Sequence, residues 1–147
     1  MSDLPRQQVV ERVREETRHG GKKPGPAVHD DLCAVTDENG RTRHEFTAKR
    51  PNQLWLTDVV EHTTTAQCKL YLCAEKDVFT NKIIGYSIDS SMRSSLAVNA
   101  LDNAVAMRGD VVGCVVHSDR GSKFRSRKFL RALAHHRMAG SMGRVAS

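Results

Sequence analysis

Two aspartates, Asp58 and Asp119, are placed where their side chains could share a cation. Asp58 falls in an alternating segment and projects from the same strand face as Leu54 and Leu56, and Asp119 directly follows an apolar run. On adjacent strands the two carboxylates would repel each other and lose hydration unless a cation lay between them. Because Mg²⁺ prefers carboxylate oxygens, the pair predicts a hard divalent metal site. The alternative is structural, with Asp58 ending a strand and Asp119 beginning a turn.

Positive charge is concentrated immediately after Asp119. The chain has 147 residues and a net charge of +6, and residues 119–147 hold eight of its 23 Lys and Arg residues but one acidic residue. We expect a polyanion such as DNA to meet the chain there, beside the predicted cation. The predicted DNA contacts are Arg120, Lys123, Arg125, Arg127, Lys128 and Arg131. The alternative is a solvated helix face, which accounts less naturally for the residues that precede the helix.

The elements that must position these residues follow from hydrophobic periodicity. The sequence predicts strands over 54–61, 69–74, 82–89 and 111–116, a helix over 95–108 between Ser94 as N-cap and Gly109, and a helix over 127–136. The residues of this last helix predicted to face inward are Phe129, Leu130, Leu133 and Ala134. The strand over 111–116 is apolar on both parities, as in a central parallel strand. We therefore expect an α/β fold, a mixed sheet flanked by helices in the order βββαβα.

The first 50 residues form a separate predicted region. Residues 7–18 are typical of a short polar helix, residues 22–27 of a linker, and residues 37–43 of a loop. A boundary near Pro51 gives an N-terminal helix and linker extension over 1–50 and a core domain over 51–147. No stretch approaches the ~20 apolar residues of a membrane-spanning helix. No membrane contact is therefore expected, and the cytoplasm is the expected location.

Cysteine and histidine spacing argues against zinc. No C-x-x-C pair occurs among the four cysteines, which are Cys33, Cys68, Cys73 and Cys114. His29 and His44 precede Cys68 and Cys73, but neither pair has the close spacing of structural zinc ligands. Reduced, mostly buried thiols are expected instead. His117 is near enough to the second aspartate to support its site, and a hydrogen-bonded strand histidine accounts for it equally well.

Three blocks of sequence together resemble one family. They are residues 51–58 (PNQLWLTD), 76–86 (KDVFTNKIIGY) and 117–124 (HSDRGSKF). In this order they closely resemble the integrase catalytic core of bacterial insertion-sequence transposases, which are relatives of retroviral integrases. The resemblance runs from about Pro51 to Ser147. It implies a ribonuclease-H-like fold.

The resemblance also implies DNA cleavage and strand transfer that depend on Mg²⁺ or Mn²⁺. Asp58 and Asp119 match the first two members of an Asp-Asp-Glu triad, which is expected to bind two ions in the complete family site. The implied partner is DNA, both transposon ends and target. In such enzymes water, and then a DNA 3′-hydroxyl, attacks a phosphodiester. Trp55 and Gly85 match framework positions, and Asp77 is expected to support the site without binding metal.

The third carboxylate of the family has no counterpart after Asp119. The family's glutamate lies in a helix after the fifth strand, whereas 28 residues follow Asp119 and none of them is Asp or Glu. Glu61 has the wrong strand parity and Glu75 is no obvious substitute. Lys123 stands where glutamine is common in this motif. We therefore expect a core that is incomplete at its C-terminal end, truncated before the third catalytic residue, weakly active or inactive alone, and prone to associate through uncovered sheet surface.

The sequence is compatible with functions of two classes. The first is a fragment of a transposase whose full-length form cleaves and joins DNA in a metal-dependent reaction. The second is a non-catalytic DNA-binding or oligomerising module that inhibits full-length transposase, either by occupying DNA or by self-association. A remnant without any role is a third alternative.

Overall fold

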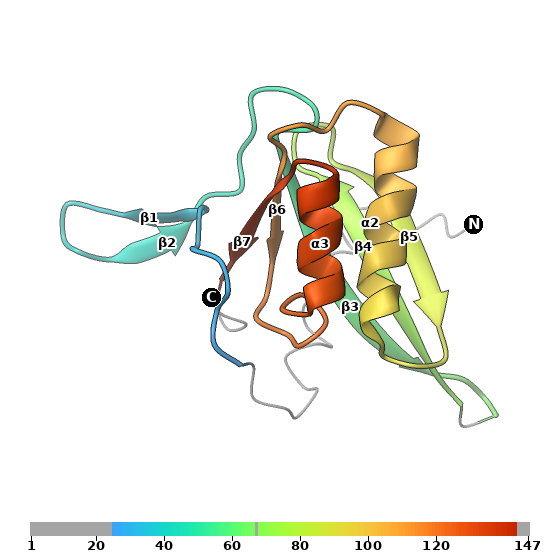
Figure 1. Ribbon diagram of the computed structural model, residues 1–147. Coiled ribbons are helices and arrows are strands. Elements are labelled where there is room, and N and C mark those ends of the chain that lie inside the picture. Colours follow the sequence, from blue (N-terminus) through green and yellow to red (C-terminus); the bar gives the residue numbers. More distant parts are fainter. Residues whose placement is uncertain (1–24, 67, 144–147) are drawn as a thin grey trace.

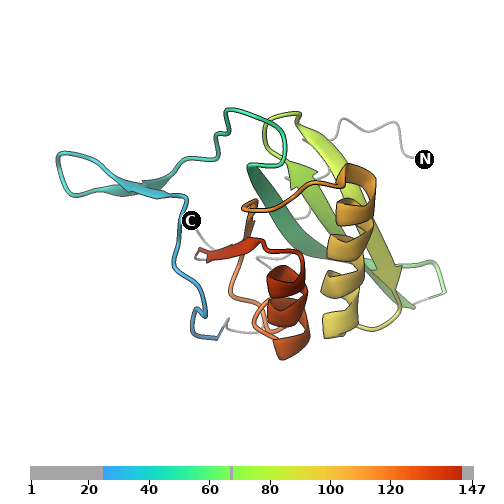
Figure 2. The same ribbon diagram turned by 45° about the horizontal axis from the view of Figure 1, so that its top comes forward.

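The fold is a mixed five-stranded sheet with two helices packed on one face (Figure 1). The computed structural model describes residues 25–66 and 68–143. The sheet contains β3 (Leu54–Thr63), β4 (Lys69–Asp77), β5 (Lys82–Asp89), β6 (Val115–Ser118) and β7 (Ala139–Met142), in the spatial order β5-β4-β3-β6-β7. The helices are α2 (Ser94–Arg108) and α3 (Arg127–His135). Two three-residue strands, β1 (Ala34–Thr36) and β2 (Thr42–His44), form a hairpin that projects from the β7 side of the sheet (Figure 2).

Strand direction follows from the connections. β3, β4 and β5 pair antiparallel through short turns, whereas β6 pairs parallel with β3 and β7 pairs parallel with β6. Each parallel connection needs a crossover, and α2 and α3 provide the two crossovers. The predicted mixed α/β sheet in the order βββαβα is confirmed, and β7 extends it at one edge.

The core lies between the sheet and the two helices. Trp55 of β3, Leu101 of α2 and Phe129 of α3 are each at most 1% exposed. Gly85 of β5 permits this close packing, because a β-carbon there would lie 2.5 Å from the backbone nitrogen of Ala104 in α2. The match of Trp55 and Gly85 to framework positions thus has a packing reason.

The predicted strand over 111–116 is displaced toward its C-terminus. Gly113 has a φ of +80° and donates its N–H to the carbonyl of Arg137 at 2.8 Å, and Val112 is 64% exposed. Because of this turn, the strand begins further along the chain than predicted, at Val115, and it includes His117. Apolar composition alone did not reveal that a left-handed glycine interrupts the run.

The helix ends and faces also differ from expectation. The helix α2 begins at Ser94, and its N-cap is Arg93, which makes no side-chain capping hydrogen bond. In α3, Phe129 and Leu133 are buried as predicted and Leu130 is half-buried. Ala134 is exposed, because it lies about 140° around the helix from Phe129, and Ala132 packs on the core instead.

The segment before β3 lies along the β7 edge. The N–H of Leu32 donates to the Ser141 hydroxyl at 2.8 Å, and the N–H of Met142 donates to the Asp30 carbonyl at 3.1 Å. The predicted loop over 37–43 is the turn of the hairpin, and its last two residues belong to β2. The predicted helix over 7–18 and the first half of the linker over 22–27 lie outside the described residues.

The sheet face opposite the helices is partly exposed. Leu54 and Leu56 of β3 are buried there, whereas Tyr86 and Ile88 of β5 are 51% and 59% exposed. The expected uncovered surface is thus found on β5. Within the described part of the chain, no helix is long and apolar enough to cross a bilayer.

Candidate functional site

Parallel pairing of β3 with β6 aligns the two predicted catalytic aspartates. Leu56 of β3 is registered with His117 of β6. The side chain of Asp58 lies on the face that carries Leu56, and the same register continued two residues further would bring Asp119 level with Asp58, one residue after β6 ends at Ser118. Both aspartates are partly exposed, so water and ions can reach them.

The turn after β6 orients the Asp119 carboxylate. Its Oδ1 accepts the N–H of Gly121 at 2.6 Å, and the Ser118 hydroxyl donates to the Asp119 carbonyl at 2.9 Å. Phe124, which is fully buried, anchors the far end of the turn, and its N–H donates to the Gly121 carbonyl at 3.1 Å. Asp119 is therefore held in a defined position at the end of its strand.

Lys123 lies beside the aspartate pair. A β-carbon on Gly121 would be 2.8 Å from Asp119 Oδ1 and 3.6 Å from Lys123 Nζ, so both charged groups border the same space. The charges of Asp58 and Lys123 also affect the pKa of the Cys73 thiol. Burial raises the pKa of the Cys73 thiol well above its usual value, Glu75 and Asp58 raise the pKa further, and Lys123 lowers it. An ammonium group therefore stands next to the predicted cation site.

The two glutamates considered as substitutes for the third carboxylate are both directed elsewhere. Glu61 pairs with Lys69 across the strands, with 3.0 Å between Oε1 and Nζ. Glu75 is registered with Thr57, so it points to the helix-covered face, away from Asp58. It is fully buried, and burial raises the pKa of Glu75 to about 8, opposed in part by the Thr57 hydroxyl. The Thr57 hydroxyl lies near this carboxyl group without hydrogen-bond geometry, so neither Glu75 carboxyl oxygen has a hydrogen-bond partner among the described residues.

Asp77 supports the strand ends. Its carboxylate is fully buried and accepts the backbone N–H groups of Asn52 at 3.0 Å and Phe79 at 2.9 Å. The Arg108 guanidinium lies 3.6 Å from the Asp77 Oδ2 atom. Asp77 thereby ties the start of β3 to the β4–β5 turn and to the end of α2, and its support of the site stays a prediction.

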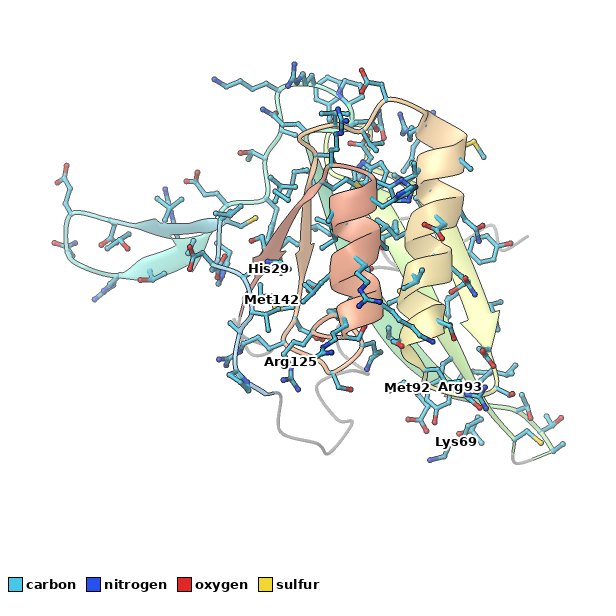
Figure 3. All side chains as sticks on the ribbon, viewed as in Figure 1. His29, Lys69, Met92, Arg93, Arg125 and Met142 are labelled. Atoms are coloured by element: carbon cyan, nitrogen blue, oxygen red, sulfur yellow. The ribbon has the colours of Figure 1, made fainter. Side chains whose placement is uncertain are left out.

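The predicted DNA contacts divide into two groups. Arg127, Lys128 and Arg131 are exposed on α3. The other three precede the helix and are partly enclosed: Lys123 Nζ lies 3.0 Å from the Met92 sulfur, Arg125 Nε donates to the Arg120 carbonyl at 2.9 Å, and Arg120 Nε is buried without a hydrogen-bond partner among the described residues. Figure 3 shows Arg125 and Met92 toward the same end of the molecule. The exposed group is the more accessible to a phosphate backbone.

A further polar cluster was not predicted from sequence spacing. Asp31, His44 and His117 come together from three segments and are the one described group of at least three such side chains close enough to hold a metal ion. Cys68 is exposed and Cys73 is buried in the core, so His44 does not meet the cysteines considered with it. The cluster left no local signal because its members are 13 and 73 residues apart.

Comparison with known families places the chain in a class of DNA recombination proteins. Residues 48–147 match the family described as integrase core domain. Because the match covers more than half of its length, the chain belongs to this family.

The transposase of insertion sequence element IS629 from Shigella sonnei is 32% identical over 123 residues, which are 84% of this chain and 40% of that protein. The transposase of element IS904 from Lactococcus lactis is 33% identical over 99 residues, 67% of this chain and 39% of that protein. The chain thus spans well under half the length of these relatives.

Solved structures show the same fold. The HTLV-2 integrase catalytic core domain in complex with magnesium, in its trimeric form, superposes with a TM-score of 0.59 at 20% identity over 68% of this chain and 65% of that one. A chain of the simian T-cell lymphotropic virus intasome in complex with PP2A regulatory subunit B56 gamma gives a TM-score of 0.57 at 18% identity, over 66% of this chain and 36% of that one. The fold is therefore that of integrase catalytic cores, which is ribonuclease-H-like.

Proposed function

We propose that this chain is the core portion of a transposase that cleaves and joins DNA, with Asp58 and Asp119 as metal ligands and catalytic residues. The observation that supports the proposal is the parallel β3–β6 register, in which Leu56 pairs with His117, each two residues before one of the aspartates. The proposal includes a core over 51–147 and a helix and linker extension over 1–50. The family match from residue 48 supports a boundary near Pro51.

The donor set fits a hard divalent ion in part. Asp58 and Asp119 offer carboxylate oxygens, the ligands that Mg²⁺ and Mn²⁺ prefer. Two features weaken the fit: the ammonium of Lys123 borders the same space, and no Asp or Glu follows Asp119 in these 147 residues. We expect the family's two ions to bind this chain weakly, and its catalytic activity alone to be low or absent.

When bound, the ions would stabilise the charge that develops on the phosphodiester during attack by water or a 3′-hydroxyl. The protein's own residues position the catalytic carboxylate and the DNA. The hydrogen bond from Gly121 holds Asp119, and in this proposal the exposed basic side chains of α3 bind the DNA backbone.

The DNA contact is tested with a labelled duplex oligonucleotide at several salt concentrations. Replacing Arg127, Lys128 and Arg131 by Gln removes three exposed charges from α3. We expect weaker binding, and a salt dependence reduced by about 0.9 in log–log slope for each phosphate that the protein no longer neutralises. Affinity is measured by fluorescence anisotropy.

A matched control removes the same charge from other surfaces. The variant Arg41→Gln, Lys49→Gln, Lys82→Gln lowers the net charge by three at exposed positions away from α3. It should keep a steeper salt slope than the α3 variant. Equal slopes for the two variants would mean that overall charge, rather than the α3 face, attracts DNA.

Catalysis is tested by incubating the chain with transposon-end DNA and Mg²⁺ or Mn²⁺. We expect little or no strand transfer, and any activity present should disappear in Asp58→Asn and Asp119→Asn. Robust strand transfer by the chain would contradict the expected dependence on a third carboxylate. Activity that survives both substitutions would contradict the assignment of the two aspartates.

The alternative function is inhibition of a full-length transposase by a DNA-binding or oligomerising module. The exposed Tyr86 and Ile88 on the open sheet face and the basic surface of α3 favour it. Mixing the chain with active transposase tests it. Inhibition should persist in Asp58→Asn and Asp119→Asn and should weaken when the three α3 charges are removed.

A further inference from the structure

Three segments far apart in sequence bring a carboxylate and two imidazoles together beside β6. Asp31 precedes β1, His44 ends β2 and His117 lies in β6. Asp31 Oδ2 is 2.5 Å from His44 Nε2, and Asp31 Oδ1 is 3.9 Å from His117 Nδ1. One ligand atom from each residue lies within 4.8 Å of the others. This is the spacing of donors that can converge on one ion.

Neighbouring groups hold the three side chains in place. The His117 Nδ1 atom and the Ser141 hydroxyl form a 2.8 Å hydrogen bond, and the Cys33 N–H donates to Asp31 Oδ1 at 3.1 Å. Phe46 packs on both imidazoles, with ring centroids 5.7 Å from His44 and 5.4 Å from His117. Such surrounding contacts fix the orientation of metal-binding histidines in known sites.

The space that these donors border is open because residue 143 is glycine. A β-carbon on Gly143 would lie 3.0 Å from His117 Nε2 and 3.1 Å from Asp31 Oδ2. Both atoms therefore face the same volume, next to His44 Nε2. The side chains of Asp31, His44 and His117 are 25%, 14% and 9% exposed, so the volume is sheltered but reachable from solvent.

We propose that Asp31, His44 and His117 form a binding site for Zn²⁺. Two imidazoles and one carboxylate suit zinc, whereas Mg²⁺ prefers oxygen ligands. A fourth position would be taken by water. Ligand atoms about 2.0–2.2 Å from a tetrahedral ion lie farther apart than the present Asp31–His44 hydrogen bond, so this pair must separate slightly on binding.

The Cys33 thiol is not among the proposed ligands. The described side chains whose ligand atoms all lie within 4.8 Å of one another are Asp31, His44 and His117, and Cys33 does not belong to that group. The proposed ion would join the segment over 31–44 to β6, the strand that ends one residue before Asp119. This role is separate from the divalent ions proposed at the aspartate pair.

Zinc titration of the metal-stripped chain tests the proposal. Calorimetry should show one Zn²⁺ per chain, and Co²⁺ in its place should give the visible absorption of a four-coordinate ion. Asp31→Asn, which keeps the size of the side chain, and His44→Gln should each weaken binding at least about tenfold, since loss of supporting residues alone costs that much in known sites. Circular dichroism confirms that each variant is folded.

Two controls and one rescue sharpen the result. The double variant His135→Gln, His136→Gln removes a surface histidine pair, and Asp58→Asn with Asp119→Asn removes the aspartate pair; both should bind Zn²⁺ like the unmodified chain. His44→Cys should restore zinc binding and add a thiolate charge-transfer band with Co²⁺. The proposal is overturned if the unmodified chain binds no Zn²⁺ in one-to-one ratio, or if Asp31→Asn and His44→Gln bind it unchanged.

Discussion

Glu75 and Asp58 lie on adjacent strands of the same sheet and have opposite surroundings. Glu75 is paired with Thr57, the residue next to Asp58, but its side chain points under the helices while that of Asp58 points to the other face. Glu75 is fully buried, and burial raises its pKa to about 8. Asp58 is partly exposed and belongs to the proposed aspartate pair with Asp119.

The difference shows that the face of the sheet decides what a carboxylate can do. A carboxyl group with no partner in the core stays protonated, because the ionised form would lose hydration. Such a group cannot serve as the missing third ligand, however near it lies. Asp77 shows a third outcome on the helix-covered face, where backbone N–H groups and Arg108 surround a buried carboxylate.

The largest expected effect concerns Glu75 and pH. Because its folded-state pKa is raised, the stability that protonated Glu75 contributes is fully present below pH about 4.5 and is lost as the pH rises through about 8. Over that range the free energy of unfolding should fall by up to about 1.4 kcal/mol per pH unit. Glu75→Gln should lack this slope, as measured by urea unfolding at several pH values.

The difference in unfolding free energy between the unmodified chain and Glu75→Gln isolates the contribution of Glu75. Other groups titrate in the same range; burial, for example, lowers the pKa of His29. Their contributions cancel when the variant is subtracted from the unmodified chain. A difference that stays constant from pH 5 to pH 8 would show that Glu75 is not protonated in the folded protein.

The second effect tests the other buried acid. Asp77→Asn keeps the shape of the side chain but removes the charge and turns an amide toward backbone donors. We expect a loss of about 3 kcal/mol in the free energy of unfolding. The exposed Asp102→Asn, which loses only a surface ion pair with His136, is the control and should cost less than about 1 kcal/mol.

The third effect concerns the aspartate pair. Asp119→Asn should weaken Mn²⁺ binding at least about tenfold, because one of two proposed carboxylate ligands loses its charge. Electron paramagnetic resonance of free Mn²⁺ measures the change. The unfolding free energy should change much less than in Asp77→Asn, since Asp119 is partly exposed. If Mn²⁺ binding were unchanged, Asp119 would not be a metal ligand, and the proposed metal site would be wrong.

The smallest effect is a gain. Lys123→Gln removes the ammonium that borders the aspartate pair and restores the residue common in the family. We expect Mn²⁺ to bind about three to ten times more tightly, since solvent and salt screen the repulsion that this change relieves. Arg93→Gln, an exposed change of the same charge, serves as the control. If both variants bind Mn²⁺ equally, Lys123 exerts no local effect.

The local hydrophobic pattern of the sequence was sufficient to predict much of the fold. The alternation of β3 and the apolar period of α2 predicted both elements, because burial of one face leaves a direct periodic record in the sequence. The predicted start of β6 at residue 111 was wrong, because the turn at Gly113 depends on a hydrogen bond to the distant Arg137. Ala134 was also assigned to the wrong side of α3, because the buried stripe is narrower than its composition indicated.

The sequence by itself determined which residue types were available: one aspartate within a predicted strand and another shortly after an apolar run, a basic segment after the second, and the motifs of an integrase core. Only the tertiary structure decided which carboxylates share a face, that Lys123 borders the aspartate pair, and that Asp31, His44 and His117 meet. The physical reason is that periodicity records burial, whereas the approach of distant side chains depends on strand register and on how separate segments pack.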